Sequence, residues 1–305
     1  MATTTASSLR LTALPPPAGR AGLAGAIRSE FTKLRSVRST YWTIAALFIV
    51  SVGIAAIAGF AIANNIHNNP GNKAGMDATQ AVLIAFFEFG QLIIAVLGAL
   101  TITSEYSTGM IRTSLTAMPR RGTVWAAKLL VFTTVILIVS LITSFVAFFV
   151  GQAALSGSGV SASLFHSVTI PRDVMETSPN HVKFVGTIVI SPGTVLTAII
   201  GCALFVTVVA LIAFALGSII RHTAGAITSA IGLMFVLPII IQVLPNTWRW
   251  DVVRFFPDAA GRVLSVTIGQ HNPHLWSAWP QFGVTLLYAA VLLGIGGYLF
   301  RKRDA

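Results

Sequence analysis

An acidic residue inside an apolar stretch is the first candidate for chemistry in this chain. Glu88 lies in the apolar run from about 80 to 104, and Gln91 follows it one helical turn later. An ionisable group in hydrocarbon costs about 2.5 kcal/mol or more on insertion scales, so it should face a bundle interior or a wet pathway. Glu88 and Gln91 are therefore candidates for a translocation pathway, and Pro238 is a candidate for a kink in a gate-lining helix. The alternatives are that a neighbouring helix or the outer interface satisfies Glu88, and that Pro238 is a packing kink.

Residues for catalysis or metal binding do not form a recognisable set. His271 and His274 have a helical spacing that could share a metal, but Pro273 separates them and no carboxylate or Cys stands at ligand spacing. An enzyme using His271 with Asp258 is one alternative, but it lacks a nucleophile. No Gly-x-x-x-x-Gly-Lys-Ser/Thr phosphate cradle occurs, so any ATP-driven work must come from a partner. We therefore predict no catalytic residue, no metal site and no cofactor bound by this chain.

The stretch from Ser104 to Lys128 is a polar, basic interruption between two long apolar runs. Ser107 and Thr108 are residues that can cap a helix, and Pro119 stops one. The spacing predicts a short amphipathic helix over about 106–118. Its apolar face would carry Met110, Ile111, Ser114, Leu115 and Met118, with Arg112, Thr113 and Thr116 opposite.

Charged residues flank this predicted helix on both sides. Glu105, at the end of the preceding apolar run, can interact with free backbone N–H groups or with Arg112. We expect Lys128, with Trp125 and two arginines, to anchor the next apolar run at the lipid headgroups. Without further knowledge, an ordinary interfacial loop is an equally good interpretation of this stretch. The two arginines are Arg120 and Arg121.

Composition identifies the class of protein. The chain has 305 residues, of which 55% are hydrophobic and only 10% charged, against about 25% charged in soluble domains. Six apolar runs are long enough to cross a bilayer as helices. The formal charge of +11 lies beside these runs rather than on an aromatic-rich surface, which argues against nucleic acid. We predict an all-α integral membrane protein with spans at about 41–63, 80–104, 126–150, 194–220, 224–244 and 279–300.

Charge and composition also predict the parts outside the spans. Placing both termini in the cytoplasm puts 14 of the 20 Lys and Arg residues on that side, as the positive-inside rule requires. Residues 1–22 should be a disordered tail, and 23–305 one six-span domain. The segment from Leu23 to Arg38 is predicted to be an amphipathic interfacial helix, with a plain basic flank as the alternative. Aromatic residues within about 245–278 predict helices at the outer interface.

Three motifs stand out beside the six-span layout. They are Glu30-Phe31-Thr32-Lys33-Leu34-Arg35-Ser36, Thr103-Ser104-Glu105-Tyr106-Ser107-Thr108-Gly109-Met110-Ile111-Arg112, and Pro119-Arg120-Arg121 with Lys128. With this layout and these motifs, the chain resembles the type-2 export permeases of the ATP-binding-cassette superfamily, the membrane subunits of bacterial exporters. The outer segment after the third span, 151–193, is longer than that family leads us to expect, and its role stays open.

The resemblance implies an exporter permease of the bacterial cytoplasmic membrane that lacks its own ATPase. Its partners would be a separate ATP-binding-cassette ATPase, which holds ATP and Mg²⁺, a second permease copy or paralogue, and the bilayer. The loop between spans two and three would be the coupling helix that contacts the ATPase. The alternative is a stand-alone carrier or channel, and no feature identifies the transported substrate. The implied coupling residues are Glu105, Tyr106, Met110, Ile111, Arg112, Leu115 and Met118.

Overall fold

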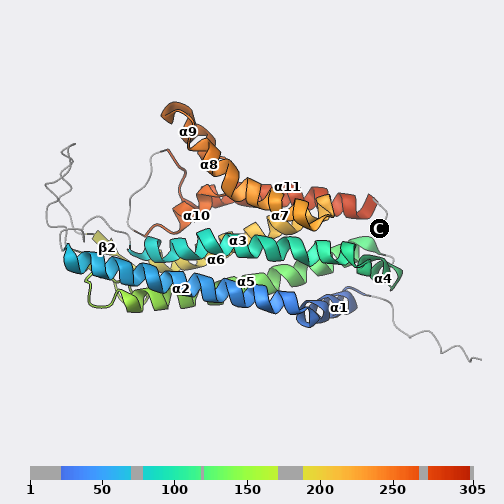
Figure 1. Ribbon diagram of the computed structural model, residues 1–305, viewed down its shortest axis with the longest axis horizontal. Helices are drawn as coiled ribbons and strands as arrows, with labels where there is room; N and C mark the ends of the chain where they lie inside the picture. Colours follow the sequence, from blue (N-terminus) through green and yellow to red (C-terminus); the bar gives the residue numbers. More distant parts are fainter. Residues whose placement is uncertain (1–21, 70–77, 118–119, 171–187, 268–273, 303–305) are drawn as a thin grey trace, which may run out of the picture.

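The computed structural model describes residues 22–69, 78–117, 120–170, 188–267 and 274–302 (Figure 1). The predicted tail, apart from Gly22, lies outside these ranges, as do Met118 and His271. The elements in chain order are α1 (Leu23–Ser36), α2 (Arg38–Asn68), α3 (Ala78–Ser107), α4 (Met110–Ala117), α5 (Arg121–Ala154), β1 (Val168–Ile170), β2 (Ile188–Ile190), α6 (Pro192–Ile220), α7 (Thr223–Ile231), the π-helical η2 (Gly232–Val236), α8 (Leu237–Ile241), α9 (Asn246–Val253), α10 (Ala259–Leu264) and α11 (Ala278–Lys302).

The prediction of an all-α protein with six membrane-crossing helices is confirmed. Among the described residues, six helical stretches are long and apolar enough to cross a bilayer, namely α2, α3, α5, α6, the continuous α7–η2–α8, and α11. Strands β1 and β2 form an antiparallel pair in which Val168 lies opposite Ile190. Multi-pass membrane insertion is therefore the architecture of this chain.

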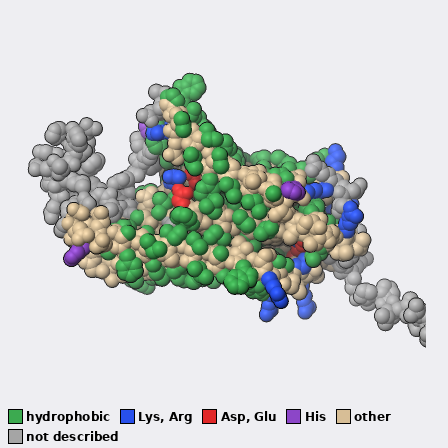
Figure 2. Space-filling model, viewed as in Figure 1, with side chains coloured by type: hydrophobic (Ala, Val, Ile, Leu, Met, Phe, Trp, Pro, Cys, Tyr) green, Lys and Arg blue, Asp and Glu red, His purple; other side chains and the backbone are tan. Residues whose placement is uncertain are grey.

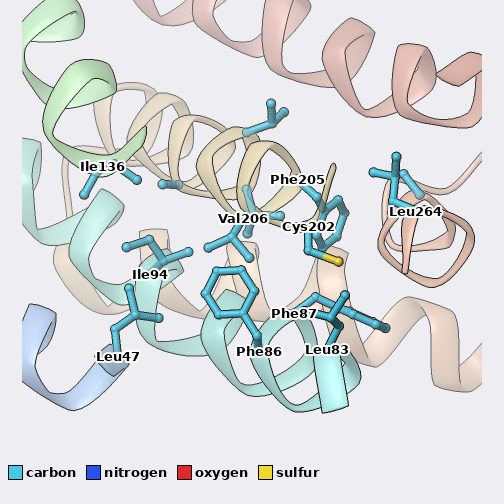
Figure 3. Close-up of a cluster of buried hydrophobic side chains, with 14 of the residues drawn as sticks. Leu47, Leu83, Phe86, Phe87, Ile94, Ile136, Cys202, Phe205, Val206 and Leu264 are labelled. Atoms are coloured by element: carbon cyan, nitrogen blue, oxygen red, sulfur yellow. The ribbon is translucent and has the colours of Figure 1, made fainter. Parts of the chain in front are cut away.

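Helix α6 is the centre of the bundle. It is the most apolar of the six spans, and 78% of an apolar 18-residue stretch within it is buried, against 22% of the corresponding stretches in α2 and in α7–η2–α8. It packs against α3, α5, α7, α10 and α11. Figure 3 shows Phe86 and Phe87 of α3 meeting Phe205 and Val206 of α6 in the core. A helix that is apolar on every side is expected at such an internal position.

Small residues let the helices approach closely. A methyl group added at Gly98 of α3 would collide with the carbonyl oxygen of Ala210 in α6. A methyl at Gly59 of α2 would lie 2.6 Å from the carbonyl oxygen of Gly151 in α5. Backbone contact of this kind is the main way that membrane helices gain packing energy, because lipid is as apolar as the side chains.

Helix α7 does not continue as a regular α-helix through Pro238. Proline has no N–H and its ring crowds the carbonyl one turn earlier, so the preceding turn must rearrange. Here it widens into the π-helix η2, in which Leu237 N–H donates to the carbonyl of Gly232. Beyond it, α8 and α9 project away from the bundle (Figure 1). Pro238 therefore lies where this span leaves the bundle.

Between α8 and α11, the described residues form two helices, α9 and α10, that differ in burial. In α9, Trp248 is 72% exposed, as expected for an interfacial helix. In contrast, α10 is packed among α3, α6 and α11, with Ala260, Gly261 and Leu264 buried. The side chain of Thr285 in α11 donates to the carbonyl of Pro257, which fixes the entry to α10. Helix α10 is thus part of the bundle rather than a surface helix.

Candidate functional site at the basic end of the bundle

Lys and Arg side chains gather at one end of the molecule, where α1, α4 and the end of α11 lie (Figures 1 and 2). Helix α4 begins after a tight turn in which Gly109 has φ +69°, a left-handed conformation that favours glycine. The predicted caps of α4 bond elsewhere, because Ser107 and Thr108 both donate to the carbonyl of Ser104 in α3. They therefore finish α3, and Glu105 and Tyr106 belong to that helix rather than to α4.

Helix α4 has the predicted two faces, and its apolar face packs on its own protein. Ile111 is buried and Leu115 packs against the core. On the other side of α4, Met110 is 43% exposed and Arg112 is also exposed. Of the predicted coupling residues that the structure describes on α4, only Met110 and Arg112 are exposed. Met118 lies outside the described residues.

Beneath α4 lies a buried ionic cluster formed by Glu30, Lys33, Glu105 and Lys128. Lys128 Nζ lies 2.5 Å from Glu30 Oε2 and 2.6 Å from Glu105 Oε1. Lys33 Nζ lies 2.7 Å from Glu30 Oε1 and 3.6 Å from Glu105 Oε1. The four charges sum to zero and are contributed by α1, α3 and α5. The ionic cluster therefore joins three helices at one point.

The charged residues of the ionic cluster can be buried because they pair with one another. The side chains of Glu30, Glu105 and Lys128 are each less than 10% exposed. Burial alone raises the pKa of the Glu30 carboxyl, but Lys128 and Lys33 outweigh it and hold that pKa below its ordinary value. Removing one partner from such a cluster leaves an uncompensated buried charge, which is strongly destabilising.

The ionic cluster also reaches α4 directly. Lys33 Nζ donates to Ser114 Oγ at 2.9 Å, which links α1 to α4. On another side, the guanidinium of Arg221, in the turn between α6 and α7, lies 4.8 Å from the ring centre of Tyr106. The hydroxyl of Thr223 donates to that of Thr103 at 3.1 Å. Polar contacts therefore link α4 to α1, and the end of α3 to the turn between α6 and α7.

Two residues assigned to the lipid headgroups are internal. Lys128 is 4% exposed, and Trp125 is 7% exposed against the rings of Phe214 and Phe300. The flank of a span contains both outward and inward positions, and the sequence alone does not distinguish them. One feature of the sequence did indicate that Lys128 is internal. It is followed directly by apolar residues, and a lysine within an apolar run needs an acidic partner.

At the opposite end, the candidate pathway residues make a second polar group. Glu88 Oε1 lies 2.9 Å from a guanidinium nitrogen of Arg262 in α10, which also contacts Asp258. Gln91 is buried, and its amide donates to Asp258 at 3.4 Å. Glu88 therefore has a charged partner on a neighbouring helix. Arg262 and Asp258 together connect Glu88 with Gln91, whereas Pro238 lies on the projecting span.

Comparison with known proteins was informative over the first half of the chain. Residues 26–172 match the model of a family described as ABC-2 family transporter protein. The comparison with curated proteins gave no match. The matched region includes α4 and all four residues of the ionic cluster.

Proposed function

We propose, from the match of residues 26–172 to the ABC-2 family transporter model, that this chain is the permease subunit of an ATP-binding-cassette exporter. It would form the translocation pathway and depend on a separate ATPase that holds ATP and Mg²⁺. The observation that carries the proposal is the placement of α4, which presents an exposed surface while a buried ionic cluster ties its support to α1, α3 and α5.

Helix α4 is the proposed coupling helix. Its exposed face offers Met110 as an apolar contact and Arg112 as a charge for an acidic groove on the ATPase. Ile111 and Leu115 hold the helix on the permease rather than on the motor. A push on α4 would pass to α1 through the Lys33–Ser114 hydrogen bond, and to α3 and α5 through Lys128.

The basic end of the bundle is proposed to face the cytoplasm of a bacterial cell. Single cysteines test this, because the native Cys202 is fully buried. A cysteine replacing Thr113 on α4 should react with an impermeant reagent only from the cytoplasmic side. One replacing Ser167 should react only from outside, and labelling of both from the same side would refute the proposed topology.

A second permease chain is the proposed cover for the projecting span. Only 22% of the apolar 18-residue stretch of α7–η2–α8 is buried in this chain. Ile239 and Ile240 are more than half exposed. A second copy or paralogue would place two such spans beside a shared pathway.

Charge reversal on α4 tests the coupling role. The permease is co-expressed with the ATP-binding-cassette ATPase of its gene neighbourhood, and the complex is purified in detergent. We expect Arg112→Glu and Met110→Asp to lose the ATPase while still inserting and folding. Arg28→Glu, an exposed charge reversal on α1, should keep it. Leu115→Asp is a poorer test because Leu115 packs against the core.

Two results would contradict the coupling proposal. One is retention of the ATPase by both α4 variants. The other is transport by the reconstituted permease alone, without any ATPase, which would favour the stand-alone carrier.

A further inference from the structure

A cavity of about 210 Å³ lies between α1, the start of α2 and the last turns of α3. Its lining on α3 runs from Leu97 to Glu105, a length of roughly 12 Å at 1.5 Å per residue. Met110 of α4 also lines it, and the four residues of the ionic cluster form part of its wall. We call this cavity the slot.

The interior of this slot offers no charge to a ligand. Its four ionic side chains are already paired with one another. The hydroxyls of Thr101 and Thr108 donate to carbonyls of α3, at 2.7 and 2.8 Å. The rest of the lining is uncharged, with the aliphatic side chains Leu34, Val37, Leu97 and Leu100, the thioether of Met110, and the hydroxyl residues Ser39, Thr40 and Ser104. An ionic group inside the slot would lack a partner, whereas a hydrocarbon chain would regain the contacts that an empty space forfeits.

The slot opens at the level where the bilayer surface should lie. Helix α2 begins at Arg38, and Tyr41 and Trp42, one turn further, are 55% and 77% exposed, as is typical of side chains at a membrane interface. Arg35 and Arg38 are also exposed, and they alternate along the chain with lining residues of the slot. Neither arginine forms an ion pair among the residues that the structure describes. Two exposed arginines are therefore adjacent in the chain to residues that line the slot, whose own ionic groups are paired with one another.

We propose that this slot binds one lipid of the leaflet on the α1 side, with an acyl chain along α3 and an anionic phosphate headgroup at Arg35 and Arg38. A phosphate near the membrane surface is attracted by each adjacent basic residue. The chain contributes affinity through each methylene that it buries. The proposal does not rest on the exporter function, since it concerns the permease by itself.

Lipid retention on the purified full-length permease tests the proposal. The protein is reconstituted into nanodiscs containing equal amounts of phosphatidylglycerol and phosphatidylcholine, returned to detergent, and weighed by native mass spectrometry. We expect one tightly retained phosphatidylglycerol. Leu100→Trp, which fills the slot, should reduce retention about tenfold or more, the loss that corresponds to excluding two or three methylene groups. Leu130→Trp, a half-exposed position on α5, is the matched control and should retain the lipid.

Two further variants keep the test decisive. If Leu100→Trp does not fold, Val37→Trp obstructs the same slot from an exposed position. Arg35→Gln with Arg38→Gln should abolish the preference for phosphatidylglycerol, and Arg28→Gln should leave it intact.

Unchanged lipid retention in a folded slot-filling variant would overturn the site. Unchanged headgroup preference in the double arginine variant would overturn the assignment to anionic lipid. Occupation by detergent alone, or by both lipids equally, would also refute it.

Discussion

Replacing Lys128 by Met should be among the most damaging single changes in this protein. It removes the ammonium group that lies 2.5 Å from Glu30 and 2.6 Å from Glu105, and leaves two buried carboxylates with Lys33 as their remaining partner. Breaking a buried ion pair in this way costs roughly 3–5 kcal/mol. In a protein of this size we expect the melting temperature to fall on the order of 5–10 °C.

The loss of melting temperature in Lys128→Met should depend on pH, in a direction set by the ionisation of Glu30. In the wild type, Lys128 and Lys33 hold the pKa of Glu30 below its ordinary value of about 4.5 against the effect of burial. The ionised Glu30 therefore contributes stability that is present above that ordinary value and is lost as pH falls through the lowered pKa. Without Lys128, burial favours the protonated acid. The difference in melting temperature between wild type and Lys128→Met should therefore be largest near pH 7.5 and shrink toward pH 5.

Thermal unfolding in detergent, followed by tryptophan fluorescence, measures both quantities. Lys302→Met, an exposed change of the same kind, is the control and should leave the melting temperature unchanged. Adding Glu30→Gln to Lys128→Met should recover part of the loss, because it removes one uncompensated charge. The reasoning is refuted if Lys128→Met melts like wild type, or if the double variant is no more stable than the single one.

Two other predictions concern helix packing and the second polar group. Gly98→Ala should lower the melting temperature, because the added methyl group would collide with the backbone of Ala210 at a cost of about 1–3 kcal/mol. Gly53→Ala is the control and should leave the melting temperature unchanged, because the space around Gly53 is open. Arg262→Gln should also lower the melting temperature, because Asp258 is 4% exposed and loses its cationic partner, and equal melting at pH 7.5 would show that another group neutralises Asp258.

The membrane spans could be predicted from the sequence because each one depends only on the residues within its own apolar run. A run of about twenty apolar residues is sufficient evidence for a crossing helix, whatever it packs against. The amphipathic pattern of α4 was also visible, with Ile111 on one face and Arg112 on the other. What the pattern did not reveal is that Ile111 faces the protein's own bundle, because an apolar face looks the same whether it binds its own chain or a partner.

Ion pairs between residues far apart in the chain could not be predicted from the sequence. Glu88 finds Arg262 on α10, a helix expected at the outer surface but packed within the bundle. Glu30 and Lys33 lie in the segment predicted to be an interfacial helix, yet they contact Glu105 and Lys128 in the ionic cluster. No single helix contains these contacts, so they follow only from how the helices pack.

Photocrosslinking from α4 tests the coupling proposal most directly. A photoreactive amino acid is introduced at the exposed Thr113 and, as a control, at the exposed Ser167, in the complex with the ATPase. We predict a crosslinked species containing the ATPase from position 113 and none from position 167. An intact complex that crosslinks from position 167, or that gives no ATPase adduct from position 113, would contradict the role of α4 as the coupling helix.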